Sequence, residues 1–575
     1  MIRFLIIAAI LISFSQKLSS ENPASFNSME VYSGVDANFA RQRKAKIDSL
    51  KYHISFNLPA ESNLPVEGSE LISFSYKPES GDELLLDFKA TPDQVKSLTV
   101  NGKITIPVIK GDHISIPDNT LRPGHNEISI DFIAGNRALN RREDFLYTLF
   151  VPDRARTCFP CFDQPDMKAS FNLQLEIPDN WAGVSNTSTL SETYADKGRK
   201  ILTFKATEPL STYLFAFAAG EFKREDFKCG DRNFGIYYRE TDPDRIAQLP
   251  DIAADVASSL EWLEEYTGIP YPFAKYDLVI IPGFQFGGME HTGATFYTDR
   301  RMFLPSNATP DDKLSRTSLI AHETTHMWFG DYLTMRWFND VWTKEVFANY
   351  YAAAITRQLL PEFDHDLVWL RTYVGAAMGE DRTTGATSIR QTLGNLQDAG
   401  LVYNDIIYNK APVMMTKLAE LMGEESFRNA IREYLTRYGY GNASWDDLVE
   451  ILARHTSLPA AEFCEAWVNR AGLPEISFSI NNGKIICRQK DRRGSDTLWH
   501  QRFNVMLHDG NSLQQYEVIF TSDSKEVEIP IGNNFKDLSS VRIIPNSDGR
   551  GYGIFTLSQE DADNIVECLK TVSYT

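Results

Sequence analysis

The strongest chemical signal in the sequence is a pair of histidines that share a short segment with a glutamate. The segment His322-Glu323-Thr-Thr-His326 places the two imidazoles four residues apart. On a helix they share one face and can bind the same Zn²⁺ ion. Glu323, beside the first histidine, can reach a zinc-bound water and act as its general base. The spacing therefore predicts a zinc-dependent hydrolytic site.

A third ligand decides which kind of zinc site this is. A metzincin would have glycine at position 329 and histidine at 332, but the chain has Phe329 and Tyr332. Glu345 follows the second histidine by 19 residues, which leaves enough chain for a turn back against the first helix. We expect Asn339-Asp340 to cap the helix that carries Glu345. Two histidines and a glutamate leave one open position, as a catalytic zinc site requires.

A glycine-containing loop precedes these residues and follows the short apolar strand predicted at Leu278–Ile281. It reads Phe286-Gly287-Gly288-Met289-Glu290-His291. The two glycines allow a ligand to approach the backbone closely, as a peptide strand added at a sheet edge requires. Glu290 can receive a cation. Taken alone, such a loop is more often an ordinary turn.

The hydrophobic pattern divides the chain into β, helical and β regions. Residues 44–222 alternate as strands do, with Asn101-Gly102 as a hairpin turn. Helical periodicity begins at 249–266, which Gly268 ends, and dominates to about residue 470. Alternation returns after residue 474, and the last residues resemble the start of a helix. The pattern predicts a multidomain α+β protein.

Composition excludes some classes of function. With 58 Lys and Arg against 77 Asp and Glu, the formal net charge is −19, which argues against a nucleic-acid partner because phosphate contact needs a basic surface. Six cysteines in 575 residues do not make a disulfide scaffold. Cys158 and Cys161 form a CxxC pair, but neither a second pair nor a βαβ context accompanies them, so we interpret the cysteines as buried thiols.

The first residues have the pattern of an export signal. Arg3 is followed by the apolar run from Phe4 to Phe14, which is too short to span a bilayer and has the length of a signal-peptide core. Small residues up to Ser20 make cleavage there plausible. The alternative is an uncleaved membrane anchor. We expect a periplasmic or extracellular protein with no stable membrane span after removal of the signal.

Together, the motifs resemble those of the M1 family of zinc aminopeptidases, the gluzincins that include leukotriene A4 hydrolase. The family combines HExxH and a later glutamate ligand with a G-[AG]-M-E-N loop, to which Gly287-Gly288-Met289-Glu290 is similar. The resemblance covers about residues 44–557. Further agreement lies in the segments Cys158–Pro165, Met335–Asp340 and Tyr408–Lys410.

The resemblance implies a role for each residue of the catalytic centre. One Zn²⁺ ion would be held by His322, His326 and Glu345. Glu323 would deprotonate the attacking water and then protonate the leaving amine. Tyr408 would stabilise the oxyanion with its phenol. On the sequence alone, Tyr403 and Tyr350 compete with Tyr408 for this role.

The resemblance also implies how substrate is held. Glu290 would bind the free α-ammonium of the substrate, which fixes the scissile bond one residue from the N-terminus. Gly287, Gly288 and Met289 would line the substrate backbone, and Phe286 would border the pocket for the first side chain. Val151 stands where the family often has a second amine-binding Glu or Gln.

Other positions depart from the family pattern. His291 replaces an asparagine, Lys344-Glu345-Val346 replaces Asn-Glu-Gly, and Pro412 interrupts a run of small residues.

The large helical C-terminal domain of many M1 enzymes is expected to be missing, which would make this a short form. The expected parts are a signal peptide at 1–20, an N-terminal β-sandwich or saddle domain at 21–225, a thermolysin-like α/β catalytic domain at 226–473, a small β-sandwich at 474–557 and a helical stub at 558–575.

The leading hypothesis is an exported zinc aminopeptidase that acts on short peptides with a free N-terminus. A zinc endopeptidase of the same fold is a second hypothesis, because Val151 removes a carboxylate from the amine site. A catalytically weak peptide-binding protein is a third. An epoxide-hydrolase side activity rests on family analogy alone. The sequence leaves the oligomeric state open.

Overall fold

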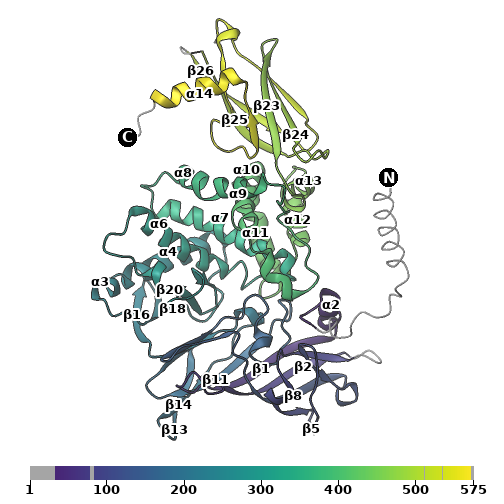
Figure 1. The fold of residues 1–575 in the computed structure, drawn as a ribbon, viewed down its shortest axis with the longest axis vertical. Coiled ribbons are helices and arrows are strands. Elements are labelled where there is room, and N and C mark those ends of the chain that lie inside the picture. The colour runs from purple at the N-terminus through teal and green to yellow at the C-terminus, as the bar shows by residue number, and fades with distance from the viewer. Residues whose placement is uncertain (1–32, 78–82, 510–511, 534, 572–575) are drawn as a thin grey trace, which may run out of the picture.

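The computed structural model describes residues 33–77, 83–509, 512–533 and 535–571. The chain folds into a mixed α+β protein with β-rich regions at the two ends and a helical region between them (Figure 1). The predicted signal peptide at 1–20 lies outside the described residues and stays a prediction. Within the described residues, no helix is long and apolar enough to cross a membrane.

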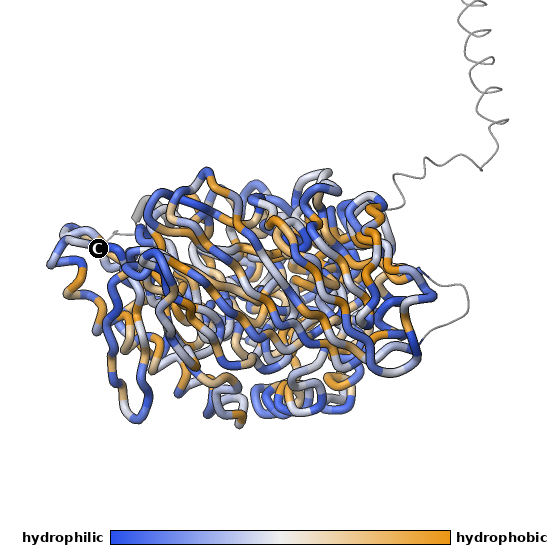
Figure 2. The backbone as a smooth tube through the Cα atoms, turned by 90° about the horizontal axis from the view of Figure 1, so that it is seen from below, coloured by the Kyte–Doolittle hydropathy of each residue, from blue (hydrophilic) through white to orange (hydrophobic). Residues whose placement is uncertain are grey.

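The N-terminal region is built on an eight-stranded sheet with the order β13-β14-β11-β1-β2-β8-β4-β5. Alternating burial along β1 and β2 shows that one face packs inward, and Figure 2 shows orange and blue positions alternating along the chain. The strands are β1 (Ile47–Asn57), β2 (Glu67–Tyr76), β4 (Val95–Val100), β5 (Lys103–Ile104), β8 (Gly124–Ile133), β11 (Ser170–Pro178), β13 (Thr189–Ala195) and β14 (Arg199–Phe204).

Local chemistry explains the turn between β4 and β5. Asn101 and Gly102 both have positive φ angles, 49° and 78°, as a tight hairpin requires. The predicted turn is therefore confirmed.

Two smaller sheets cover the inner face with the orders β12-β15-β10-β9 and β3-β7-β6. Their strands are β3 (Leu84–Asp87), β6 (Val108–Lys110), β7 (His113–Ile116), β9 (Leu139–Arg141), β10 (Phe145–Thr148), β12 (Ala182–Ser185) and β15 (Phe217–Gly220).

The CxxC cysteines are buried in this region. Cys158 and Cys161 are fully buried, and both are free thiols. Burial raises the pKa of each thiol well above its ordinary value. A thiol that is buried and protonated is unreactive. The interpretation as structural thiols is confirmed for this pair.

The central region is built on a five-stranded sheet. Its order is β16-β17-β18-β20-β19, in which β17, β18 and β20 are parallel and β19 closes one edge in the antiparallel direction. Helix α4 (Leu249–Thr267) ends at Gly268, whose φ of 72° is left-handed, as the sequence predicted. The strands are β16 (Lys223–Cys229), β17 (Arg232–Tyr238), β18 (Asp277–Ile281), β19 (Gly288–Met289) and β20 (Ala294–Thr298).

Helices surround this sheet and continue the chain towards the C-terminal region. Among them, α6 (Pro310–His326) and α7 (Trp342–Leu359) pack against each other and carry the HExxH segment and Glu345. The other helices of this region are α3 (Pro243–Ile246), α5 (Asp299–Met302), α8 (His365–Trp369), α9 (Gly375–Asp381), α10 (Ala411–Met422), α11 (Glu424–Tyr438), α12 (Trp445–Arg454) and α13 (Ala460–Cys464). Helix α2 (Ala37–Lys46) belongs to the N-terminal region, where it packs against β1.

The C-terminal region forms two small sheets with the orders β27-β24-β23-β29 and β26-β25-β28. Their core is separate from the continuous core that joins the N-terminal and helical regions. The elements are β23 (Pro474–Asn481), β24 (Lys484–Asp491), β25 (Gln501–His508), β26 (Leu513–Phe520), β27 (Glu526–Pro530), β28 (Arg542–Ile544), β29 (Ile554–Thr556) and helix α14 (Gln559–Thr571).

One local expectation is wrong. Neither Asn339 nor Asp340 caps the helix that bears Glu345, since α7 begins after Val341 and has no side-chain cap. The Asp340 carboxylate instead accepts hydrogen bonds from Nε of Arg390 at 2.7 Å and from the backbone N–H of Trp445 at 3.0 Å. Asp340 therefore ties the turn between the two helices to α12, a partner more than 100 residues away in sequence.

Candidate active site

Helix α6 brings the two histidines onto one face. The helix begins with a capping box, in which Thr309 and Asp312 satisfy each other's backbone N–H groups, and Pro310 occupies its first turn. It ends at His326, so the HExxH segment forms its last turns. The Nε2 atoms of His322 and His326 consequently point to the same place, 3.1 Å apart.

The third donor comes from α7. Oε2 of Glu345 lies 3.6 Å from Nε2 of His322 and 3.6 Å from Nε2 of His326. Donor atoms around a tetrahedral zinc ion, with bonds near 2.0–2.1 Å, lie about 3.3–3.4 Å apart. Two imidazole nitrogens and a carboxylate oxygen also suit zinc chemically. The spacing and the donor types therefore fit one zinc ion, and the structure brings together the three ligands predicted from the sequence.

The other ring nitrogens of the histidines fix their tautomers. Nδ1 of His326 lies 3.0 Å from the carbonyl oxygen of Phe329, and Nδ1 of His322 lies 2.9 Å from Oδ1 of Asn349. The amide orientation of Asn349 is set because its Nδ2 donates to the carbonyl oxygen of Tyr408 at 2.9 Å. Both Nδ1 atoms must donate, so both Nε2 atoms present lone pairs to a metal.

Glu323 lies beside the donors and against the glycine loop. Its side chain is buried, and burial raises the pKa of its carboxyl to about 8. A β-carbon added to Gly288 would lie 2.4 Å from Oε1 of Glu323. Glycine at 288 is therefore required for this close approach. A carboxyl with a raised pKa is suited to exchange protons near neutral pH.

The loop also forms the free edge of the central sheet. Gly288 and Met289 make up β19, which pairs on one side with Tyr297 and Phe296 of β20. Because β19 is the last strand in the sheet order, its other edge is available to an added peptide strand. The structure thus places Gly288, one of the residues predicted to contact substrate, next to Glu323.

Glu290 follows β19 and is buried, but it already has a cationic partner. Nζ of Lys344 lies 2.6 Å from Oε1 of Glu290 and 2.7 Å from Oε1 of Glu345. Burial alone would raise the pKa of Glu290, but the Lys344 ammonium holds that pKa below its ordinary value. Burial would likewise lower the pKa of Lys344, yet its carboxylate partners hold it well above the usual range.

These residues line a cavity of about 820 Å³. The lining includes Tyr403 and Tyr408, two of the three tyrosines predicted as candidates for the oxyanion role. Tyr350 lines a different hollow. Val151 and Phe286 border the cavity as well, so the position of the second amine-binding group expected in the family is occupied by an apolar side chain.

Two residues that contact the candidate site, Asn349 and Lys344, are not predicted from the sequence. Asn349 lies four residues after Glu345, one helical turn on the same face, and this spacing was the available signal for a residue that orients a ligand. In the sequence, Lys344 stands out only as a departure from Asn-Glu-Gly. Nothing local to the sequence indicated that its ammonium reaches Glu290, because the contact joins helix α7 to a loop 54 residues away.

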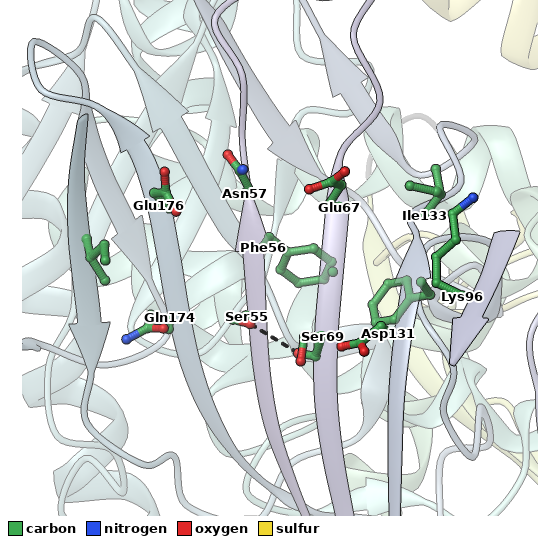
Figure 3. A pocket seen from close by; sticks show the side chains of 13 residues that line it. Ser55, Phe56, Asn57, Glu67, Ser69, Lys96, Asp131, Ile133, Gln174 and Glu176 are labelled. Atoms are coloured by element: carbon green, nitrogen blue, oxygen red, sulfur yellow. Dashed lines mark hydrogen bonds between the residues drawn. The ribbon is translucent and has the colours of Figure 1, made fainter. Parts of the chain in front are cut away.

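A second hollow lies on the outer face of the N-terminal sheet (Figure 3). It has a volume of about 310 Å³ and is lined by residues of β1, β2, β4, β8, β11 and β14, among them Glu67, Asp131 and Lys96. Among the described residues, the groups arranged to hold a metal ion all lie at the α6–α7 site. This outer hollow therefore does not share the chemistry of the active site.

Comparison with known protein families agrees with this fold and this donor set. The family model described as the peptidase family M1 domain matches residues 253–467, and the model of the peptidase M1 N-terminal domain matches residues 48–214. The first match contains all three candidate zinc ligands and Glu323. The chain belongs to peptidase family M1.

Particular relatives carry aminopeptidase names. The chain is 31% identical to puromycin-sensitive aminopeptidase of Caenorhabditis elegans over 68% of this chain and 42% of that protein. It is 30% identical to probable aminopeptidase 2 of Sulfurisphaera tokodaii over 60% and 43%. It is 29% identical to aminopeptidase N of Streptomyces lividans over 76% and 52%. The chain spans about half the length of the curated relatives it matches.

Proposed function

We propose that the protein is a zinc-dependent aminopeptidase that hydrolyses the N-terminal peptide bond of short peptides. The observation that carries the proposal is the convergence of His322, His326 and Glu345 next to the buried carboxyl of Glu323. The aminopeptidase names of the relatives support the same activity.

In the proposed mechanism, each residue has a separate task. His322, His326 and Glu345 would hold a zinc ion, which would supply Lewis acidity and lower the pKa of water. Glu323 accepts the proton of the attacking water and passes it to the leaving amine. A tyrosine hydroxyl at the cavity, which we assign to Tyr408, donates to the carbonyl oxygen as negative charge develops there.

Substrate positioning falls to the glycine loop. The open edge of β19 offers backbone groups of Gly287 and Gly288 to an extended peptide, and Met289 anchors the strand from the core. Glu290 stands at the end of this strand, where the substrate amine is expected. Alignment of the peptide along β19 holds the scissile carbonyl near Glu323.

A specific observation favours an endopeptidase as the second candidate. The carboxylate expected to bind the substrate ammonium is already paired with Lys344 at 2.6 Å, and Val151 offers no second carboxylate. With less to hold a free N-terminus, a longer peptide could pass through the cavity and be cut internally.

Product analysis separates the two candidates. The zinc-loaded protein is incubated with an unblocked hexapeptide, and the products are identified by mass spectrometry over time. An aminopeptidase releases single residues in order from the N-terminus, whereas an endopeptidase gives internal fragments first. Activity should disappear with a chelator and return with added zinc. Single-residue release that persists without bound metal would contradict the proposal.

A further inference from the structure

Arg301 enters the cavity from the end opposite Glu290. Strand β20 runs antiparallel to β19, and the backbone N–H of Thr298 donates to the carbonyl oxygen of Gly287 at 3.0 Å. Helix α5 follows β20 directly, so its Arg301 lies past the Gly287 end of β19, whereas Glu290 lies past the other end. The proposed function places the substrate amine at Glu290, so the residues after the scissile bond run along β19 towards Arg301.

A contact with α6 gives the distance of Arg301 from the catalytic centre. Its Nη2 donates to Oγ of Ser315 at 2.6 Å, and Ser315 lies seven residues before His322 on the helix. Seven helical residues span about 10 Å. Two residues of extended peptide cover about 7 Å, and one hydrogen bond of about 3 Å completes this distance. The guanidinium is therefore within reach of a carboxylate on the second residue after the scissile bond.

The cavity continues into a second hollow at this point. Arg301 and Ser318 line both the cavity and the adjoining hollow, which has a volume of about 420 Å³. One carboxylate of that hollow, Asp312, is already engaged, because its Oδ2 accepts hydrogen bonds from the backbone N–H of Thr309 at 2.8 Å and from its hydroxyl at 2.7 Å. The substrate thus has room to extend past Arg301.

Arg301 differs from the other arginines of this hollow because it has no carboxylate partner among the described residues. Arg371 pairs with Asp311 at 3.0 Å, and Arg357 pairs with Asp366 at 2.8 Å. The Arg301 guanidinium makes only its hydrogen bond to a neutral hydroxyl. Its remaining N–H groups are available to a planar anion, and a carboxylate matches their geometry.

The charges of the whole lining also favour an anion. The charged side chains that line the cavity are three carboxylates, Glu290, Glu323 and Glu345, and three cations, Arg154, Arg301 and Lys344. A divalent ion on the three zinc donors would add two positive charges to this balanced set. A substrate carboxylate would therefore enter a cavity of net positive charge.

We propose that Arg301 is a specificity-determining residue that binds a substrate carboxylate on the C-terminal side of the scissile bond. The preferred substrates would then be tripeptides with a free C-terminus, or short peptides with an acidic side chain after the scissile bond. Both sources present the same chemistry to the guanidinium, an anion that accepts two parallel N–H bonds. The inference rests on the proposed aminopeptidase function and deepens it, because it names the substrate class.

Matched peptides test the inference through kcat/KM for leucine release. Leu-Gly-Gly and its C-terminal amide differ in the terminal carboxylate, whereas the amides of Leu-Glu-Gly and Leu-Gln-Gly differ in a side-chain carboxylate. We expect the zinc-loaded wild type to prefer the carboxylate at least fivefold in one pair or both, and the pair identifies the source. Arg301→Gln should reduce this preference below twofold, and Arg301→Lys should keep part of it. A wild-type preference below twofold in both pairs, or one that Arg301→Gln leaves unchanged, would overturn the inference.

Arg154→Gln is the matched control. It removes the same charge from the lining of the same cavity, but from the N-terminal region beside Val151 and Pro152. Because the proposed contact is made by Arg301, this variant should keep at least half of the wild-type preference for the carboxylate. Equal loss of the preference in Arg154→Gln and Arg301→Gln would show a general effect of charge and would overturn the inference.

A binding measurement separates this inference from the proposed function. Zinc-loaded Glu323→Gln lacks the proposed general base, so calorimetry can measure the Kd of intact peptides. We expect the carboxylate peptide of the preferred pair to bind at least fivefold more tightly than its partner, and expect Arg301→Gln in the same background to abolish the difference. Equal Kd values within both pairs would contradict the inference even if the wild type hydrolyses peptides. If the wild type hydrolyses none of the peptides, the proposed function fails, whereas the Kd values still decide whether Arg301 binds a carboxylate.

Discussion

Oδ1 of Asn349 lies 2.9 Å from Nδ1 of His322 and fixes the tautomer of that histidine. Removal of the acceptor frees the ring to rotate and to place its proton on Nε2. We therefore expect Asn349→Ala to weaken zinc binding by about 10- to 100-fold. Competition with a chromogenic chelator measures the change in zinc affinity.

Asn349→Asp provides the matched control. An aspartate keeps an oxygen acceptor opposite Nδ1, so zinc affinity should stay within a few-fold of the wild type. The variant loses only the hydrogen bond from Nδ2 to the carbonyl oxygen of Tyr408. Equal loss of affinity in the alanine and aspartate variants would show that Asn349 acts by packing and not by orienting the histidine.

Gly288 sets the position of the proposed general base. Since a β-carbon there would lie 2.4 Å from Oε1 of Glu323, Gly288→Ala must push the carboxylate away. We expect kcat/KM to fall by at least a hundredfold while the zinc content stays at one ion per chain, because the ligands are untouched. Kinetics together with metal analysis on the same sample test this.

The neighbouring glycine is the control for that change. A β-carbon on Gly287 would meet only the end of the flexible Leu319 side chain, at 3.3 Å. Its alanine variant should therefore lose less than tenfold in kcat/KM. A similar loss of kcat/KM in both variants would mean that the substitutions act by changing the loop and not by displacing the carboxylate of Glu323.

His291 makes the fold sensitive to acid. Its ring is fully buried, neither nitrogen has a hydrogen-bond partner among the described residues, and burial lowers its pKa to about 3. The unfolded chain takes up this proton near pH 6.5, so below that pH the unfolded state binds more protons and stability falls. Because of His291, the free energy of unfolding should be about 2 kcal/mol lower at pH 5 than at pH 7.

Substitution of His291 by methionine isolates this effect. The apolar side chain gives up no hydrogen bond. Between pH 7 and pH 5, the free energy of unfolding of the variant should therefore fall by about 2 kcal/mol less than that of the wild type. Urea unfolding at both pH values measures the difference. His125→Gln, which changes a histidine whose side chain is 62% exposed, is the control. An unchanged pH dependence in His291→Met would refute the assignment.

The sequence predicted the parts of the site that local structure determines. The spacing of His322 and His326 follows from the helical period, and Glu345 lies where a second helix can return. The α+β class followed from a change of hydrophobic period, and the hairpin turn at residues 101–102 from its Asn-Gly pair. Each inference needed only residues close together in the chain.

The remainder depended on contacts between distant segments. Asp340 has a side chain that often caps a helix. Here its carboxylate instead accepts hydrogen bonds from Arg390 and from the backbone of Trp445. Lys344 reaches Glu290 only because α7 packs beside the loop after β19. Burial and pairing of this kind follow from tertiary packing, to which the spacing of residues along the chain gives no guide.

The central claim is that Glu323 acts as general base beside a zinc ion held by the three donors. The most direct test is amino-acid release from a short peptide by the wild type and by Glu323→Gln, each shown by metal analysis to hold one zinc ion per chain. We predict that kcat/KM in the variant falls by at least a hundredfold, while zinc content and Tm match the wild type. Equal rates in the two zinc-loaded proteins, whether high or negligible, would contradict the account.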